Sequence, residues 1–265
     1  MDGKDWRERL RRAAPKIHCL TNPVSMQDMA NLLLAAGGSA IMAQDPEEVQ
    51  EITSFCQATL LNTGVPDREK FLACTAAGME ANKLGHPVVL DPVGVGASRF
   101  RRKHMELLLN KVHPSIIRCN QEEAYTLLHM QTGVSGGVES AVSVGQREQE
   151  VTAGKLAGMY QCTAFISGEI DVISDGERLC VLSGGDRRMA RLTGSGCMLS
   201  ALCALFCGAG LSSYEAACAA GSIWKESSRI AGERTEKIQG GMGSFHRHLF
   251  DALDRLCNES KEETV

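Results

Sequence analysis

Short apolar runs alternate with longer amphipathic stretches along most of this chain, and this alternation restricts its possible folds more than any other feature. A short, continuous apolar run is typical of a strand buried on both faces, and such strands occur in parallel sheets covered by helices. The pattern predicts an α/β fold of three layers, in which helices flank a mostly parallel central sheet. The expected strands are residues 16–20, 40–43, 58–62, 87–90, 115–118 and 163–166.

Helix start and stop signals divide much of the remaining chain. Asp67 and Gly85 enclose an expected helix at 67–84, because aspartate caps a first turn and glycine ends a helix readily. Asp45 is expected to cap a helix that begins at Pro46, since proline suits a first helical position. Ser25 is expected to cap a helix that ends at 36. The other expected helices are 100–112, 122–129, 146–160, 198–206, 212–231 and 244–256.

Two segments depart from the alternation of strands and helices. Asp175 and Gly176 favour a tight turn, which predicts a β-hairpin from strands at 171–174 and 178–182. Residues 131–145 are rich in Gly, Ser and Val and lack periodicity, so a mobile loop or a weak helix is expected there. No segment resembles a linker, and we expect the whole chain, 1–265, to form a single domain.

The composition argues against two classes of partner. With a net charge of −4 and a pI near 6.0, the chain lacks the basic surplus that neutralises nucleic-acid phosphates. The N-terminus is unlike a secretion signal and no apolar stretch is long enough to span a bilayer, so we expect a cytoplasmic protein without a membrane partner. The eleven cysteines include no Cys-x-x-Cys pair and are expected to be mostly buried thiols.

The most informative motif is Thr-Gly-Ser-Gly-Cys at residues 193–197, which opens the expected helix at 198–206. Gly194 and Gly196 have no Cβ, so backbone N–H groups around Ser195 can converge on one anion. The positive end of the helix dipole adds to that attraction, as in phosphate-binding loops. A turn of small residues before a core helix is the alternative interpretation.

Cys197 has the most reactive predicted setting of the cysteines, because a thiol at a helix N-terminus has a lowered pKa. Such a thiol can act as a base or as a nucleophile. A nucleophilic cysteine needs a histidine partner, and none of the seven histidines follows a strand in a suitable arrangement. The closely spaced His246 and His248 are interpreted as a solvated face. Phosphoryl transfer needs mainly positioning and charge neutralisation, which suits the motif better.

Polar residues follow the expected strands at the edge where ligands bind in open α/β sheets. Asp91 follows the strand at 87–90 and can hold Mg²⁺ through water, orient a phosphate-bearing ligand or cap a turn. Arg118 ends the strand at 115–118, where a guanidinium can neutralise a transferring phosphate. Asn120 and Glu123 begin the next helix and can position hydrated Mg²⁺ or form a capping box, and these two roles are compatible.

These motifs, in their order and spacing, resemble those of the hydroxyethylthiazole kinase family, a thiamine-salvage branch of the ribokinase-like superfamily. The resemblance covers nearly the whole chain and implies a ribokinase-like fold. It also implies ATP-dependent phosphorylation of the alcohol of 4-methyl-5-(2-hydroxyethyl)thiazole for thiamine biosynthesis, with Mg²⁺, by a homotrimer whose active sites lie between subunits. The matching segments are 17–22 (IHCLTN), 39–43 (SAIMA), 90–97 (LDPVGVGA), 117–120 (IRCN), 167–173 (SGEIDVI) and 193–197 (TGSGC).

The resemblance further implies a role for individual residues. Those that would contact the thiazole are Asn22, Met42 and Gly194. Those that would bind ATP are Arg118, Ser167 and Asn120. Asp91 and Glu123 would serve the Mg²⁺ centre. Cys197 would occupy the place of an aspartate base in related sugar kinases, and the backbone of Gly194, Ser195 and Gly196 would stabilise the transferring phosphoryl group.

Three other functions are compatible with these residues. A kinase for another vitamin alcohol, such as hydroxymethylpyrimidine or pyridoxal, shares the glycine-rich opening, although the segments around Asn22 and Met42 match the thiazole kinases. A cysteine acyltransferase would use Cys197 as its nucleophile and would not need ATP. A non-catalytic thiazole sensor would bind the ligand without consuming ATP.

Overall fold

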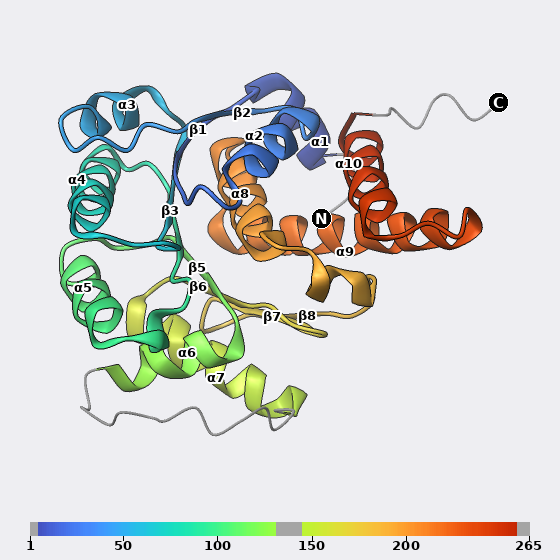
Figure 1. Ribbon diagram of the computed structural model, residues 1–265. Coiled ribbons are helices and arrows are strands. Elements are labelled where there is room, and N and C mark those ends of the chain that lie inside the picture. Colours follow the sequence, from blue (N-terminus) through green and yellow to red (C-terminus); the bar gives the residue numbers. More distant parts are fainter. Residues whose placement is uncertain (1–4, 131–144, 259–265) are drawn as a thin grey trace.

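The computed structural model describes residues 5–130 and 145–258, which build one eight-stranded sheet (Figure 1). The strand order is β2-β1-β3-β4-β5-β6-β7-β8. Neighbours from β2 to β6 are parallel, whereas β7 and β8 pair antiparallel, so the predicted mostly parallel sheet is confirmed. The strands are β1 Lys16–Leu20, β2 Ser39–Ile41, β3 Ala58–Asn62, β4 Val88–Asp91, β5 Ile116–Cys119, β6 Thr163–Ile166, β7 Asp171–Ser174 and β8 Leu179–Leu182.

Helices cover both faces of the sheet and bury an apolar cluster on each (Figure 1). Successive strand residues point to opposite faces, so Val89 packs in one cluster while Val88 and Leu90 pack in the other. The first face carries α1 Asp5–Ala13, α2 Met26–Ala35, α8 Ser195–Gly208, α9 Ser213–Lys237 and α10 Met242–Asn258. The second carries α3 Val49–Phe55, α4 Arg68–Leu84, α5 Arg99–Leu109, α6 Gln121–His129 and α7 Gln146–Tyr160.

Several element limits agree with the prediction because neighbouring residues set them. The Asp67 side chain accepts the N–H of Lys70 at 2.8 Å, and Gly85 ends α4 with φ of +70°. The limits of β1, β3, β6 and α7 agree residue for residue. Local signals, the caps of α4 and the mostly apolar runs of the strands, were therefore sufficient to place these elements.

Helix α3 begins at Val49, so the predicted start at Pro46 is wrong. The Asp45 carboxylate accepts the N–H of Glu47 at 2.9 Å. The Asp45 carbonyl accepts the N–H groups of Glu48 and Val49. Asp45 thus stabilises a turn that precedes the helix. An aspartate can cap a turn as readily as a helix, so the same residue in the sequence indicates either one, which accounts for the error.

Two further predicted limits were wrong, the end of α9 and the start of β8. Helix α9 continues to Lys237 instead of ending at 231, although Gly232 lies within it. A Cβ at Gly232 would lie 1.9 Å from Asp186 Oδ2, so this glycine permits close packing and is no stop signal. The β7–β8 hairpin is confirmed, but its turn contains residues 175–178, and Asp175 accepts the N–H of Arg178 at 2.7 Å.

The remaining expectations concern features outside the sheet. No helix in the described part of the chain combines the length and hydropathy needed to cross a membrane. All eleven cysteines lie in the described ranges and are free thiols, and most are buried, as predicted. The predicted loop or weak helix at 131–145 falls on residues 131–144, which lie outside the described residues.

Candidate active site

Four neighbouring strands, β1, β3, β4 and β5, bring polar side chains to the carboxyl edge of the sheet. Asn22 lies just beyond β1, Asn62 ends β3, Asp91 ends β4, and Arg118 lies near the end of β5. Asn62 and Asp91 are direct neighbours in the parallel register of β3 and β4. Because α8 begins with its first turn beside this edge, strand ends and a helix N-terminus together form the candidate site.

Asp91 is the centre of this group, and its side chain is fully buried. Its Oδ2 accepts hydrogen bonds from Asn62 Nδ2 at 3.0 Å and Ser200 Oγ at 2.8 Å, and Arg118 Nη1 lies 3.5 Å away. Burial raises the pKa of Asp91, whereas the charge of Arg118 and these hydrogen bonds oppose the rise. Asp91 Oδ1 has no hydrogen-bond partner among the described residues, so this oxygen can accept one from a ligand.

Two side-chain amides connect this carboxyl to the first turn of α8. Asn22 Nδ2 donates to Asn62 Oδ1 at 3.0 Å and lies 3.7 Å from Cys197 Sγ. The amide oxygens are fixed by the backbone, because Asn22 Oδ1 accepts the N–H of Val24 and Asn62 Oδ1 accepts that of Gly64. The amide of Asn22 therefore has a set orientation toward the thiol.

The predicted lowering of the Cys197 pKa is wrong. Burial and the negative charge of Asp91 raise the pKa of the Cys197 thiol above its ordinary value. Hydrogen bonds with Ser25 and Asn62 and the charge of Arg118 offset this rise only in part. The position at a helix N-terminus was visible in the sequence, but the buried carboxyl beside it was not. Cys197 is therefore a protonated thiol at neutral pH.

The glycine-rich turn before α8 presents fewer amides than predicted. Gly194 has φ of +81°, and a Cβ there would lie 2.9 Å from Ser25 Cβ, so glycine is required on both counts. Ser25 makes no side-chain cap for α2, contrary to prediction, and instead faces this turn. Ser195 donates its N–H to the Leu192 carbonyl and its hydroxyl to Met189. The amides left for an anion are those that follow Ser195 in the first helical turn.

Gly196 lets α8 approach Arg118 closely. A Cβ at Gly196 would lie 2.5 Å from Arg118 Nη1 and 2.7 Å from Nη2, so any side chain there would displace the guanidinium. Arg118 Nη2 also donates to Ser167 Oγ, just after β6. Arg118 therefore connects Asp91, the first turn of α8 and the loop that begins at Ser167.

Asn120 and Glu123 form the predicted capping box at the start of α6. Asn120 Oδ1 accepts the N–H of Glu123 at 2.8 Å, and Glu123 Oε2 accepts the N–H of Asn120 at 2.9 Å. Glu123 Oε1 also accepts the N–H of Gly94 at 2.8 Å. Burial and the charge of Asp91 raise the pKa of Glu123, and these N–H donors oppose the rise. Both carboxyl oxygens thus already hold a backbone donor.

Met42 lies apart from this network, just beyond β2 at the edge of the sheet. Strand β2 ends at Ile41, earlier than the predicted 43, and the Ala43 carbonyl beyond it bonds to a buried histidine instead of continuing the sheet. His18 Nε2 hydrogen-bonds to the Ala43 carbonyl at 2.9 Å, and its Nδ1 to Thr53 at 2.8 Å. Met42 is half-buried against the first-face cluster, and nothing links it directly to Asp91.

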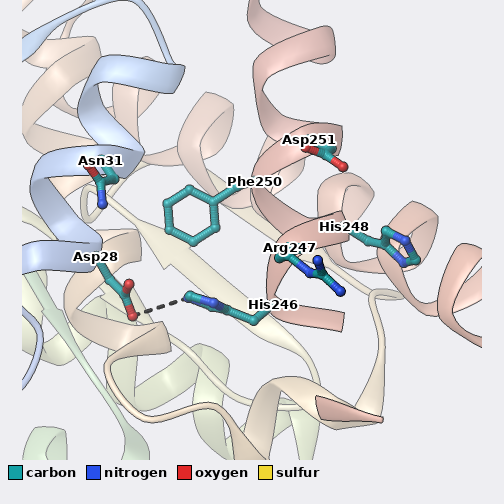
Figure 2. A pocket seen from close by; sticks show the side chains of 7 residues that line it. All are labelled: Asp28, Asn31, His246, Arg247, His248, Phe250 and Asp251. Carbon is teal, nitrogen blue, oxygen red and sulfur yellow. Dashed lines mark ion pairs between the residues drawn. The ribbon is translucent and has the colours of Figure 1, made fainter. Parts of the chain in front are cut away.

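A separate hollow of about 510 Å³ lies between α2 and α10, and none of the predicted site residues lines it (Figure 2). His246 points toward α2, where its Nε2 lies 3.2 Å from Asp28 Oδ2, and its ring packs edge-on against Phe250. His248 instead hydrogen-bonds to Thr235 at 3.2 Å. The two histidines have different partners and both are partly exposed beside the exposed Arg247, which agrees with the interpretation as a solvated face.

Comparison with known proteins places the chain in a family. The sequence model of the Hydroxyethylthiazole kinase family matches residues 8–259. The chain belongs to this family. It is 39% identical over 255 residues to the hydroxyethylthiazole kinase of Clostridium botulinum (strain Alaska E43 / Type E3), covering 96% of this chain and 91% of that protein.

Solved structures agree with this assignment. Hydroxyethylthiazole kinase from Pyrococcus horikoshii OT3 superposes with a TM-score of 0.84 at 31% identity, over 95% of this chain and 92% of that one. A ribokinase-like superfamily protein from Enterococcus faecalis V583 has a TM-score of 0.64 at 9% identity, over 94% of each chain. The second likeness concerns the fold alone, and it confirms the predicted ribokinase-like architecture.

Three polar residues of this hydroxyethylthiazole kinase family member escaped the sequence analysis. Asn62 ends the apolar strand β3, and Ser200 lies within the apolar part of α8, so each was a polar interruption of a buried run. Those interruptions could have identified them. Lys70 lies in the first turn of α4 and resembles any solvated helix lysine, yet only 8% of its surface is exposed. Its burial depends on distant loops and has no local sequence signal.

The raised pKa of Cys197 leads to a testable reactivity. We expect alkylation of Cys197 by iodoacetamide to be slow at pH 7 and to increase with a midpoint above about 8.5, the ordinary cysteine value, because only the thiolate reacts. Peptide mapping by mass spectrometry at a series of pH values separates Cys197 from the other thiols. Protein unfolded in urea serves as the control. A midpoint below about 7.5, in the range of helix-activated thiols, contradicts the assignment.

Proposed function

We propose that this chain transfers the terminal phosphoryl group of ATP to the primary alcohol of 4-methyl-5-(2-hydroxyethyl)thiazole, the activity named by its family. The observation that carries the proposal is the buried Asp91, placed between two groups of polar residues. Asn22 and Asn62 lie on one side, and Arg118 and Ser167 lie on the other. The neutral amides on the first side suit an alcohol, and the positive charge on the second side suits a nucleotide.

Phosphoryl transfer would join the alcohol oxygen to the terminal phosphorus, break the bond from that phosphorus to ADP and release the hydroxyl proton to water. The transition state is loose, so the protein contributes mainly positioning and charge neutralisation. The N–H groups of Gly196 and Cys197 at the start of α8 would bind the transferring group. Arg118 would neutralise charge on the ATP side, with Ser167 and Asn120 completing the nucleotide site. Ser195 would support this turn through its bonds to the preceding loop.

The alcohol would lie near Asn22, Met42 and Gly194. Because Cys197 is protonated at neutral pH, we propose that it shapes the anion site and does not act as a strong base. Asp91 Oδ1 remains able to accept a hydrogen bond from the alcohol or from a bound water. A site without a strong base agrees with phosphoryl transfer through a loose transition state, which needs little base catalysis.

Mg²⁺ fits the same centre as a partner of ATP. In residues 5–130 and 145–258, no three His, Cys, Asp or Glu side chains gather into a metal-binding group. Mg²⁺ at nucleotide sites commonly uses one or two carboxylates together with water and phosphate oxygens. Asp91 Oδ1 supplies one such oxygen, and Glu123 would act through water because N–H donors already occupy its oxygens. When bound with ATP, Mg²⁺ would neutralise phosphate charge.

One assay tests this function. We expect the protein to form thiazole phosphate and ADP from ATP, Mg²⁺ and the thiazole alcohol, and to use hydroxymethylpyrimidine and pyridoxal poorly; phosphorylated products are identified by mass spectrometry. As a matched variant, Arg118→Ala should raise the KM for ATP about tenfold or more, since a charged partner of phosphate is lost. Ligand binding without product, or product without ATP, would refute the proposal.

We also propose a homotrimer acting in the cytoplasm, with each site completed by a neighbouring subunit. Exposed apolar side chains in the segments that carry Asn22, Gly64 and Lys70 support a shared site, because Val24 is 63% exposed, Val65 56% and Leu72 63%. Apolar groups this exposed around a binding site are typical of a protein interface. Eleven free thiols suit a reducing compartment.

Sedimentation equilibrium tests the assembly. We expect a trimer mass for the wild type and a lower mass for Leu72→Glu, because a charge on α4 would have to be desolvated in the interface. Ile238→Glu is the matched control, since Ile238 is 60% exposed but follows α9 on the other face of the sheet. A monomeric wild type, or the same mass for both variants, counts against the proposal.

A further inference from the structure

A buried lysine connects the two loops that carry Asn22 and Asn62. Lys70 Nζ donates to the Thr21 carbonyl, just after β1, and to the Gly64 carbonyl at 2.8 Å, just after β3. Thr21 directly precedes Asn22, and Gly64 lies two residues beyond Asn62. One ammonium group therefore fixes the distance between two loops that are far apart in sequence.

The position of Lys70 is unusual for a lysine. Only 8% of its surface is exposed, and among the ion pairs of the described residues none includes it. Burial lowers its pKa, as expected for an ammonium removed from water. A buried charge without a direct ion pair is costly, and the charge of the nearby Asp67 and the two backbone carbonyls offset only part of that cost. Stability alone is thus a poor explanation for a lysine at this buried position.

The two loops held by Lys70 meet at the amide pair. A Cβ at Gly64 would lie 2.8 Å from Asn22 Nδ2, so these two loops are in close contact. Asn22 Nδ2 bridges from there to Asn62 and toward Cys197. A shift of either carbonyl would therefore move the Asn22 amide relative to the first turn of α8.

The other half of the site has a comparable lysine. Lys225 of α9 donates to the Glu169 carbonyl at 2.8 Å and the Gly168 carbonyl at 3.2 Å, and lies 3.4 Å from Asp171 Oδ1. Gly168 and Glu169 belong to the loop that follows Ser167, and Asp171 begins β7 directly after it. Lys225 makes no hydrogen bond to the loops that Lys70 holds. Variants of the two lysines can therefore be compared for their effects on the alcohol side and on the ATP side of the site.

We infer that Lys70 is a positioning residue for the alcohol: its ammonium, bound to the Thr21 and Gly64 carbonyls, sets the Asn22 amide at the geometry that binds this substrate. The inference rests on the proposed function. It assigns Lys70 no contact with ATP. Removal of the ammonium should therefore weaken alcohol binding selectively, whereas a general loss of folding would affect both substrates.

Steady-state kinetics with both substrates varied tests this role. For Lys70→Met we expect the KM for the thiazole alcohol to rise about tenfold or more, with the KM for ATP changed less than about twofold, because a small misplacement of binding groups is felt locally. Lys225→Met should show the reverse pattern. Lys83→Met, on the same helix with a side chain 72% exposed, is the neutral control.

Two further variants keep the test decisive. Lys70→Arg retains the charge and donors and should restore much of the alcohol affinity, while Lys70→Gln replaces Lys70→Met if the latter does not fold. Thermal unfolding of each variant, with and without the alcohol, reports binding independently of turnover. Equal rises in both KM values, or an unchanged KM for the alcohol in a folded variant, overturn the inference. An inactive wild type refutes the proposed function instead.

Discussion

The burial of Asp91 is the constraint on which the site depends. A carboxyl group removed from water is costly unless donors reach it, and here the donors come from three elements. Asn62 comes from β3, Arg118 from β5 and Ser200 from α8, and all approach the same oxygen. These contacts tie the end of β4 to both neighbouring strands and to α8. The other oxygen keeps its capacity for a ligand.

Positive charge is distributed around this carboxyl in two different ways. Arg118 lies beside Asp91, and Gly196 leaves the space that its guanidinium occupies. Lys70 and Lys225 instead donate to loop carbonyls on either side. The planar guanidinium of arginine can donate two parallel hydrogen bonds to a phosphate, whereas the compact ammonium of lysine can donate to several carbonyls that point at one spot. Charge neutralisation and loop placement thus fall to separate residues.

The fold was largely predictable from the sequence because its signals are local. An apolar run defines β3, and Asp67 with Gly85 defines α4, without reference to the rest of the chain. Asp45 shows the limit of this reasoning, since the same side-chain bond stabilised a turn before α3.

The candidate site was predictable in its residues but less so in its chemistry. Strand-end position identified Asp91 and Arg118, and the motif identified Cys197. The raised pKa of that thiol depends on burial beside Asp91, which lies in a distant part of the sequence. Lys70 was missed for the same reason, because its burial arises from loops after two other strands. Properties set by long-range packing require the structure.

The turnover of Asp91→Asn tests the central role of this carboxyl most directly. Asparagine keeps the size of the side chain and can still accept from Asn62 or Ser200, but it removes the charge. We predict that kcat with ATP, Mg²⁺ and the thiazole alcohol falls about 100-fold or more, as for other losses of preorganised charge, while circular dichroism shows a folded protein. A folded variant with kcat within about threefold of the wild type would contradict this role.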